Sequence, residues 1–347
     1  MIVVAEYIWV DGNGIIRSKT RTCELSGANN IKSYKKWNYD GSSTGDAVGS
    51  DSEIILNPIA VYPDPFRTSD DGFCRLILCD TYLPDGNPTV FNTRVNAVKI
   101  FSKYTEAVPW YGLEQEFFIM DGESVSYRSY TSSAPIGTRN SVDAEKPQGQ
   151  YYCSVGYQNA FGRHITEEAY LLALSAGLKC SGLNAEVAPG QWEIQVGPCE
   201  GISAADQLII LRYILLRVGE MRKVQISLHP KPIKGNWNGS GCHTNFSTKK
   251  MREEGGYTYI IEAIEKLKLK HSDHMEVYGK YNELRCSGNH ETSDYNTFSY
   301  GVANRGSSIR IPRETEKLGA GYFEDRRPAS NMNPYLVTSK ILKTIMN

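Results

Sequence analysis

Several features that the sequence lacks argue against a fibrous, membrane-spanning or disulfide-stabilised protein. It has no internal repeat, no low-complexity tract and no long run of one charge. Its eight cysteines are scattered without a CxxC pair, which indicates reduced thiols in a cytoplasmic compartment. The most apolar stretch, 208–218, carries Arg212 and Arg217, and no run approaches the roughly 18 apolar residues of a membrane span. We therefore expect no membrane partner.

Other absences narrow the function. The apolar N-terminus has no basic segment and no small-residue cleavage site, so no signal peptide is expected. With 38 basic and 39 acidic residues the net charge is −1, which gives no general attraction to nucleic acid. No GxxxxGK[ST] occurs, and no GxGxxG follows a strand pattern, so P-loop and dinucleotide-binding folds are excluded. Any anion site must come from local clustering of charge.

A length of 347 residues suggests two domains. Alternating apolar residues predict strands at 2–10 and 15–22, joined by a turn over the Asp-Gly-Asn-Gly sequence at 11–14. A further strand is predicted at 75–82. The proline- and glycine-containing segment 83–88 then interrupts the pattern. We place the domain boundary there, which gives domains 1–86 and 93–347.

The second domain alternates predicted helices with predicted strands. The helices are expected at 93–106, 166–179, 203–222 and 257–270, and the strands at 110–120, 191–196 and 226–229. Asn92 or Thr93 is expected to cap the first helix, and Thr166 to begin the second. The helix at 203–222 has one apolar stripe. This order predicts an α+β protein with a small β-rich domain followed by a large antiparallel-sheet domain flanked by helices.

Two glutamates stand out in the predicted strand 110–120. Because side chains two residues apart share a face of a strand, Glu114 and Glu116 lie side by side in an otherwise apolar segment. Two buried carboxylates this close repel each other unless a cation neutralises them. An edge strand with one face in water would also explain the pattern, so this segment alone leaves both interpretations open.

A second segment shifts the balance toward a metal. In the strand beginning at Gln191, Glu193 faces the same way as Gln191 and Gln195. The Pro189-Gly190 turn brings Glu186 near Glu193. Glutamate oxygens without cysteine are typical ligands of a hard cation, Mg²⁺ or Mn²⁺.

The remaining signals are a histidine and a group of arginines. His243 follows the glycine-containing loop 236–241, and an isolated histidine is more often a satisfied core or surface residue than a ligand. Six arginines lie at positions 285, 305, 310, 313, 326 and 327. Scattered arginines usually mark a solvated face, but beside a carboxylate cluster they suit phosphoryl transfer, because guanidinium binds phosphate with two hydrogen bonds.

These residues closely resemble eukaryotic-type glutamine synthetase over nearly the whole chain, from about Glu6 to about Ser339. The segments that carry the resemblance are Trp37–Thr44, Leu113–Glu116, Asn184–Val187, Gln191–Glu193, Lys231–Ile233, Gly235–Gly239, Gly241–Ser247, His290–Ser293, Val302–Arg305 and Tyr322–Pro328. The family's fold is an N-terminal β-grasp domain and a C-terminal catalytic domain. Its active sites lie between neighbouring subunits of a homo-oligomer, which in the eukaryotic type is a decamer of two stacked pentameric rings.

The resemblance implies two or three divalent metals per site with ATP as co-substrate. It implies that one metal is held by Glu116, Glu186 and Glu193, and a second by Glu114, His243 and Glu324. The implied nucleotide contacts are Glu114, Glu193, Asn245, Phe246, Ser247, Arg305, Arg310, Tyr322, Phe323 and Glu324.

The resemblance also implies the reaction and its remaining partners, L-glutamate and ammonium. Glutamate attacks ATP to give γ-glutamyl phosphate, and ammonia then displaces phosphate. The implied glutamate-binding residues are Asn236, Trp237, Asn238, Gly239, Arg285, Arg305 and Arg326. Arg305 and Arg310 stabilise phosphoryl transfer. Asp40, with Ser43 nearby, takes the proton from ammonium, and Glu291 lies on a flap that excludes water.

The chain departs from the family pattern in three places. It begins almost at the first strand, so the family's N-terminal arm is expected to be short or absent. Cys286-Ser287-Gly288 replaces the usual Leu-Thr-Gly, and the stretch 128–147 is divergent. Two alternative functions stay open at this point, a γ-glutamyl-amine (polyamine) ligase and a non-catalytic homologue. Asp40 with Glu291 favours ammonium over a larger amine, and the complete set of metal glutamates favours catalysis.

Overall fold

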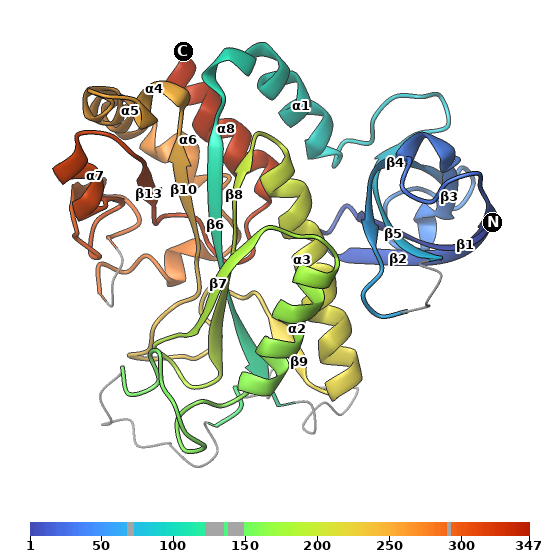
Figure 1. The fold of residues 1–347 in the computed structure, drawn as a ribbon, viewed down its shortest axis with the longest axis horizontal. Coiled ribbons are helices and arrows are strands. Elements are labelled where there is room, and N and C mark those ends of the chain that lie inside the picture. The colour runs from blue at the N-terminus through green and yellow to red at the C-terminus, as the bar shows by residue number, and fades with distance from the viewer. Residues whose placement is uncertain (68–72, 122–134, 138–148, 290–292) are drawn as a thin grey trace. The chain divides into compact units, whose positions relative to one another are not determined.

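The computed structural model describes residues 1–67, 73–121, 135–137, 149–289 and 293–347. The chain divides into two compact units, residues 1–99 with 171–178, and residues 100–170 with 179–347 (Figure 1). Each unit is described by itself. The boundaries drawn from the sequence, 1–86 and 93–347, stay a prediction.

The first unit is built on a five-stranded sheet. Its strands are β1 (Ile2–Val10), β2 (Ile16–Glu24), β3 (Trp37–Asp40), β4 (Glu53–Pro63) and β5 (Cys74–Tyr82). They lie in the order β2-β1-β5-β4-β3, and only the central pair β1 and β5 is parallel. The predicted turn at 11–14 is held by Asp11, whose carboxylate accepts hydrogen bonds from the amides of Asn13 and Ile15, both at 2.9 Å. The three strands predicted in this part of the chain are confirmed.

The second unit is built on a larger sheet, eight-stranded within the described residues. Its strands are β6 (Trp110–Met120), β7 (Cys180–Ala185), β8 (Gln191–Glu200), β9 (Gln225–Ser227), β10 (Cys242–Ser247), β11 (Tyr300–Val302), β12 (Ile309–Ile311) and β13 (Phe323–Asp325). The order is β11-β12-β13-β10-β6-β8-β7, and β9 adds to the far end of β6. All pairs are antiparallel except β11 with β12. β6 is therefore an interior strand (Figure 1), which excludes the edge-strand interpretation of Glu114 and Glu116.

All four predicted helices are present. The one at 203–222 agrees at both ends, the ones at 93 and 257 begin where predicted, and the second begins three residues earlier than predicted. The helices of the described residues are α1 (Thr93–Lys103), α2 (Arg163–Ser175), α3 (Ser203–Arg222), α4 (Lys249–Arg252), α5 (Tyr257–Leu269), α6 (His271–Met275), α7 (Arg313–Leu318) and α8 (Pro334–Met346). Asn92 caps α1 as expected, accepting from the Val95 amide. The prediction that Thr166 begins a helix is wrong. Gly162, with φ of +83°, permits the turn that starts α2 earlier, and Thr166 is a buried interior residue whose hydroxyl bonds the Gly162 carbonyl.

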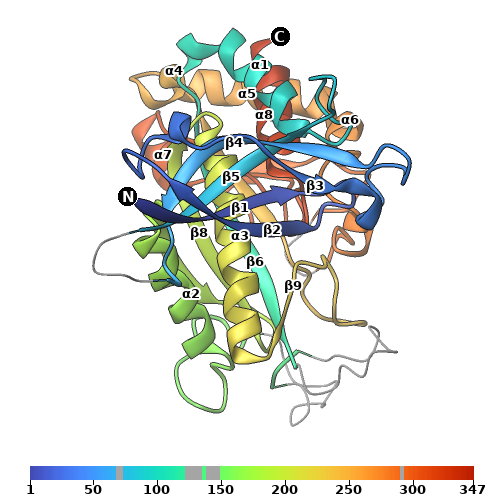
Figure 2. The ribbon, with the colours of Figure 1, turned by 90° about the vertical axis from the view of Figure 1, so that its right-hand side faces the viewer.

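The helix α3 is more deeply buried than one apolar stripe predicts. Every residue from Ala204 to Leu215 is buried. The helix packs against β8, β6 and β9 on one side and against α8 on another (Figure 2). Its polar members are therefore inside the protein and need partners.

Arg212 of α3 is one of these buried polar residues, and it finds its partners behind the sheet. Its guanidinium donates to the Gln115 side chain at 2.7 Å, and to the carbonyls of Ser330 and Met332, both at 2.9 Å. Gln115 in turn donates to the Glu116 carbonyl at 2.8 Å. Burial lowers the pKa of the Arg212 guanidinium. This network fixes the back of β6, opposite the face that carries Glu114 and Glu116.

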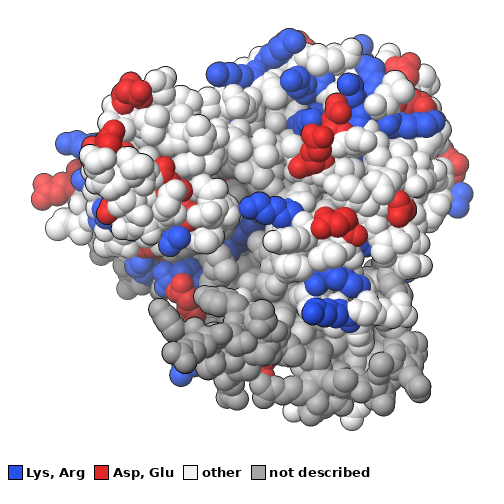
Figure 3. All heavy atoms as spheres, turned by 180° about the vertical axis from the view of Figure 1, so that it is seen from behind, with Lys and Arg blue, Asp and Glu red and all other residues white. Residues whose placement is uncertain are grey.

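The surface agrees with the neutral composition. Among the described residues visible in Figure 3, basic and acidic side chains are spread together over the face. In the described part of the chain, none of the helices combines the length and the apolarity that crossing a bilayer requires. The predicted α+β architecture, a small β-rich part and a larger sheet flanked by helices, is confirmed.

We expect Arg212→Met to lower the free energy of unfolding by about 2–5 kcal/mol, because three buried acceptors lose their donor. Thermal and denaturant unfolding measure the change. Arg222→Met on the same helix is the control, because Arg222 is exposed and pairs with Glu168 at 2.6 Å. Equal unfolding midpoints for the two variants would contradict a structural role of the Arg212 network.

Candidate metal and nucleotide site

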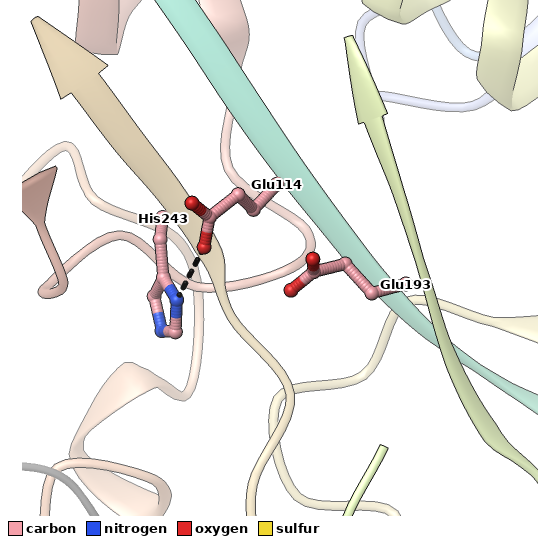
Figure 4. Close-up of side chains that lie close together, drawn as sticks. All are labelled: Glu114, Glu193 and His243. Atoms are coloured by element: carbon pink, nitrogen blue, oxygen red, sulfur yellow. Dashed lines mark hydrogen bonds and ion pairs between the residues drawn. The ribbon is translucent and has the colours of Figure 1, made fainter. Parts of the chain in front are cut away.

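Three neighbouring strands place acidic and imidazole side chains on one face of the second sheet. In the registers of β6 with β8 and with β10, Glu116 lies opposite Glu193, and Glu114 lies opposite His243. Figure 4 shows Glu114, Glu193 and His243 directed into the same space from these strands, with His243 Nδ1 at 3.2 Å from a Glu114 carboxylate oxygen. Strand pairing alone thus brings four predicted ligands together.

Glu186 joins them through the predicted turn. Its backbone amide donates to the Gln191 carbonyl at 2.9 Å, which closes the turn over Pro189-Gly190. Gly190 has a φ of +68°, and a Cβ there would lie 2.9 Å from the Ile136 carbonyl oxygen, so only glycine fits. Oxygen atoms of Glu116, Glu186 and Glu193 all lie within 4.8 Å of one another, and ligand atoms of Glu114, Glu193 and His243 do likewise.

Glu324 comes from β13, on the far side of β10. It lies opposite Asn245 and Arg310 in the strand registers. Its carboxylate pairs with Arg326 at 2.6 Å and with Arg310 at 3.2 Å, and one oxygen lies 3.4 Å from His243 Nδ1. The sixth predicted ligand therefore reaches the cluster, and two arginines reach it with Glu324.

Burial dominates the electrostatics of the cluster. It raises the pKa of Glu116 to about 7, raises the pKa of Glu114, and raises the pKa of Glu193 well above the ordinary range. For Glu193 the neighbouring glutamates add to the effect. Burial also holds the pKa of His243 well below its usual value, so that the imidazole is neutral. Buried carboxylates that repel one another beside a neutral imidazole are the donor set of a divalent cation.

The cluster opens into a cavity of about 360 Å³. It is lined by the six predicted ligands and by Tyr152, Asn184, Gln195, Ala303, Arg305, Arg310 and Arg326. Three of the four arginines predicted for phosphoryl transfer and for substrate, Arg305, Arg310 and Arg326, therefore border the same space as the carboxylates, whereas Arg285 is buried behind it, beside His243. The residues fit one or more hard divalent cations next to an anionic ligand.

A second, more apolar cavity of about 430 Å³ shares Glu114 and Gln195 with the first. Of the predicted nucleotide contacts, Asn245, Phe246, Ser247 and Tyr322 also line it. Phe323, also predicted to contact the nucleotide, is fully buried with its ring 5.6 Å from that of Phe246, and it is not among the residues that line either cavity. An apolar pocket continuous with a carboxylate and arginine cavity suits a base joined to phosphates.

The loop predicted to bind glutamate lies between β9 and β10. Trp237 packs with Ile233 against buried residues Phe118, Met120 and Ala188. A Cβ at Gly239 or at Gly241 would lie 2.5–2.6 Å from side-chain atoms of Arg285, so both positions require glycine. Arg285 is buried, and its Nη2 lies 3.0 Å from His243 Nε2. Asn236 is exposed and Asn238 is buried.

The predicted ammonium residues belong to the first unit. Asp40 precedes a short 3₁₀ turn, Gly41–Ser43, and its carboxylate accepts from the Ser42 amide at 2.9 Å and from the Ser43 hydroxyl at 3.1 Å. Hydrogen bonds from Ser42 lower the pKa of this exposed carboxyl, which keeps it ionised. Glu291 lies outside the described residues.

Sequence reasoning missed several lining residues. Gln195 shares the face of Glu193, so strand alternation gave a signal for it, whereas Tyr152 and Ala303 lie in irregular segments that carry no periodic signal. Cys286, where the sequence departs from the family pattern, lies next to Arg285. Its buried sulfur lies 3.5 Å from Arg285 Nη1.

The chain is similar over nearly its whole length to known proteins. The family model described as "Glutamine synthetase, catalytic domain" matches residues 93–257. The chain is 52% identical over 347 residues to glutamine synthetase cytosolic isozyme 1-2 of Oryza sativa subsp. japonica. The aligned residues make up 99% of this chain and 94% of that relative. The chain is also 52% identical to glutamine synthetase root isozyme 3 of Zea mays (99% and 93%) and 51% identical to the glutamine synthetase of Kluyveromyces lactis (99% and 88%).

The pKa of Glu116 leads to a pH prediction for the metal-free protein. Between pH 6.5 and 8 the unfolded Glu116 is already ionised, whereas the folded carboxyl loses its proton only as the pH passes about 7. The protonated Glu116 carboxyl therefore contributes stability that is complete below its ordinary pKa of 4.5 and is lost progressively as the pH rises from there through about 7, so the range from pH 6.5 to 8 covers the last part of the loss. We expect the thermal midpoint in EDTA to fall from pH 6.5 to 8.

Added Mg²⁺ should reverse this loss, because a cation stabilises the ionised carboxylates. The difference between the midpoints with and without Mg²⁺ should widen from pH 6.5 to 8, and should widen less in Glu116→Gln. A difference that stays constant or narrows in the unmodified protein would show that Glu116 does not titrate in this window.

Proposed function

The chain belongs to the glutamine synthetase family, and we propose that it ligates ammonia to L-glutamate at the two joined cavities of its second unit. The observation that carries the proposal is the meeting of the six acidic and imidazole side chains with Arg305, Arg310 and Arg326 around one cavity. A non-catalytic homologue has no reason to keep repelling carboxylates buried together.

The residues divide into two metal positions. We assign Glu116, Glu186 and Glu193 to one, and Glu114, His243 and Glu324 to the other, for two or three Mg²⁺ or Mn²⁺ ions per site. Ligand atoms of Glu193 also lie within 4.8 Å of those of Glu114 and His243, and a Glu324 oxygen lies 3.4 Å from His243 Nδ1. Bound divalent metal neutralises the phosphate oxygens of ATP and polarises the γ-phosphoryl group. The neutral imidazole of His243 and the ionised carboxylates are the protonation states that such ligation needs.

The chain's own groups then direct the chemistry. Arg305 and Arg310 border the cavity where charge develops during phosphoryl transfer, and Arg285 and Arg326 hold the carboxylates of glutamate. The apolar cavity lined by Phe246, Ser247 and Tyr322 takes the adenine and ribose. With glutamate positioned against the γ-phosphate, a side-chain carboxylate oxygen of glutamate bonds to the γ-phosphorus and the bond to ADP breaks, which gives γ-glutamyl phosphate and ADP. Ammonia then attacks the acyl carbon, and phosphate leaves as glutamine forms.

Ammonium has no lone pair until it loses a proton, and we assign that step to Asp40. Its low pKa keeps it ionised, and Ser43 donates to its carboxylate. Asp40 serves the site of a neighbouring subunit in a homo-oligomer, for which we propose two stacked pentameric rings. Glu291 is assigned to a flap that excludes water. Several relatives are named as cytosolic isozymes, and we extend that location to this chain.

Phosphate release from ATP and Mg²⁺ tests the reaction. We expect release to require glutamate and ammonium together, and to fall at least about 100-fold in Glu116→Ala, because a metal ligand is lost. Glu254→Ala, which removes an exposed glutamate of the same unit, is the control and should behave as the unmodified protein. Release with polyamines in place of ammonium would instead identify an amine ligase. If a folded and assembled protein released no phosphate with either acceptor, a non-catalytic homologue would be favoured.

Mixing two inactive variants tests the shared site. Asp40→Asn and Glu116→Ala subunits each lack one half of every site, if Asp40 acts on a neighbour. Assemblies formed from an equal mixture then contain intact sites, about one quarter of the total when subunits mix at random. We expect activity to recover toward that fraction after the two variants are dissociated and reassembled together, and not in either variant treated alone. No recovery in mixed assemblies of unchanged size would place both residues in one subunit's site.

A further inference from the structure

Gln191, the first residue of β8, joins the carboxylate cluster to the loop assigned to glutamate. It is 1% exposed and faces the same side as Glu193. Its Nε2 donates to Glu116 Oε2 at 3.2 Å and to the Gly239 carbonyl at 2.9 Å. Its Oε1 accepts from the Ala188 amide at 3.2 Å, and this contact fixes which way the amide points, because a flipped side chain would set two donors against each other.

The two oxygens of Glu116 have different surroundings. Oε2 accepts from Gln191 and also from the Gly241 amide, at 2.6 Å. Oε1 lies 3.8 Å from His243 Nε2, on the side of the cluster. One carboxylate oxygen is thus bonded toward the loop, while the other faces the other candidate ligands.

The end of the loop is therefore bonded to Glu116 at two points. Gly241 contacts the carboxylate directly, and Gly239 contacts it through Gln191. Neither glycine has space for a side chain, because Arg285 fills the volume beside both. Movement of the Glu116 carboxylate by a few tenths of an ångström consequently displaces the loop backbone, since close-packed groups transmit such shifts.

We propose that Gln191 is a positioning residue that couples cation binding at Glu116, Glu186 and Glu193 to the affinity of the loop for glutamate. The proposal rests on the proposed function for the role of the loop. An ion drawn to Glu116 orders its carboxylate, and Gln191 passes that order to Gly239. Coupling of this kind is reciprocal, so glutamate must raise the affinity for the cation by the same factor.

The chain offers a matched control on the same strand. Gln195 also donates to a candidate ligand, Glu193 Oε1, at 2.7 Å, and its second hydrogen bond goes to Asn184 Oδ1 at 3.5 Å rather than to the loop. Methionine replaces glutamine with similar volume and without donors. Gln191→Met and Gln195→Met therefore both remove a hydrogen bond to the cluster, but only Gln191→Met cuts the connection to Gly239.

The experiment is calorimetric titration of the assembled protein with Mn²⁺, and with glutamate in the presence and absence of saturating Mn²⁺, with ADP throughout. We expect Mn²⁺ to tighten glutamate binding in the unmodified protein, within the roughly 5- to 150-fold range of such couplings. Both variants should bind Mn²⁺ about 10- to 100-fold more weakly. Only in Gln191→Met should the factor by which Mn²⁺ tightens glutamate binding fall close to one.

Each other outcome has a definite meaning. A Gln191→Met protein that keeps the unmodified coupling factor overturns the inference, as does an equal loss of coupling in Gln195→Met. An unmodified protein that binds Mn²⁺ and glutamate independently overturns it too. Failure of the unmodified protein to bind Mn²⁺ at all would count against the proposed function instead. If Gln191→Met does not assemble, Gln191→Asn, which is one methylene too short to reach Gly239, takes its place with the same expected loss of coupling.

Discussion

The repulsion among buried carboxylates on the face of β6 is the constraint on which the second unit depends. Glu114, Glu116 and Glu193 stand on neighbouring interior strands, and burial raises the pKa of all three. Burying such groups together is unfavourable unless they bind protons or cations. The raised pKa of Glu116 and Glu193 expresses this cost. Such a cluster is therefore stabilised either by bound protons or by divalent cations.

The opposite faces of the same strands carry the buried polar residues that hold these strands in place. On β6, Gln115 points away from the cavity into the Arg212 network. Beyond Glu324, the chain alternates again, so that Arg326 pairs with Glu324 on the cavity side while Arg327 pairs with Asp325 at 2.7 Å in the core. Two acid–base pairs thus interleave along four residues, 324–327. The alternation of a strand allows a charged site in front and a fully satisfied polar core behind.

Hydrogen bonds at the cluster are divided between the ion position and the substrate loop. Glu116 directs one oxygen toward the ion position and bonds the substrate loop with the other. Glycine is needed at 239 and 241 because Arg285 fills the space beside both positions. The proposed metal, glutamate and phosphate subsites therefore share lining residues. A change in any one of these residues is expected to alter more than one binding step, because the groups lie in direct contact.

Much of this protein could be predicted from residue order alone. The strands at 2–10 and 110–120, the helix at 203–222, and the shared face of Glu114 and Glu116 follow from periodicity, which depends only on neighbouring residues. The family resemblance supplied His243 and Glu324 as ligands, since an isolated histidine and a short strand of three residues carry little periodic signal. The start of α2 was mispredicted because the turn at Gly162 outweighed the capping preference of Thr166.

Tertiary structure alone decided which faces meet. Periodicity states the side on which Glu193 and Gln191 lie, but not that β8 and β10 flank β6, nor the register that sets Glu116 opposite Glu193 and Glu114 opposite His243. The contact of Gln191 with Gly239, 48 residues away, depends on the same pairing. Strand order and register are determined by packing of the whole unit, whereas side-chain alternation is a local property of the backbone.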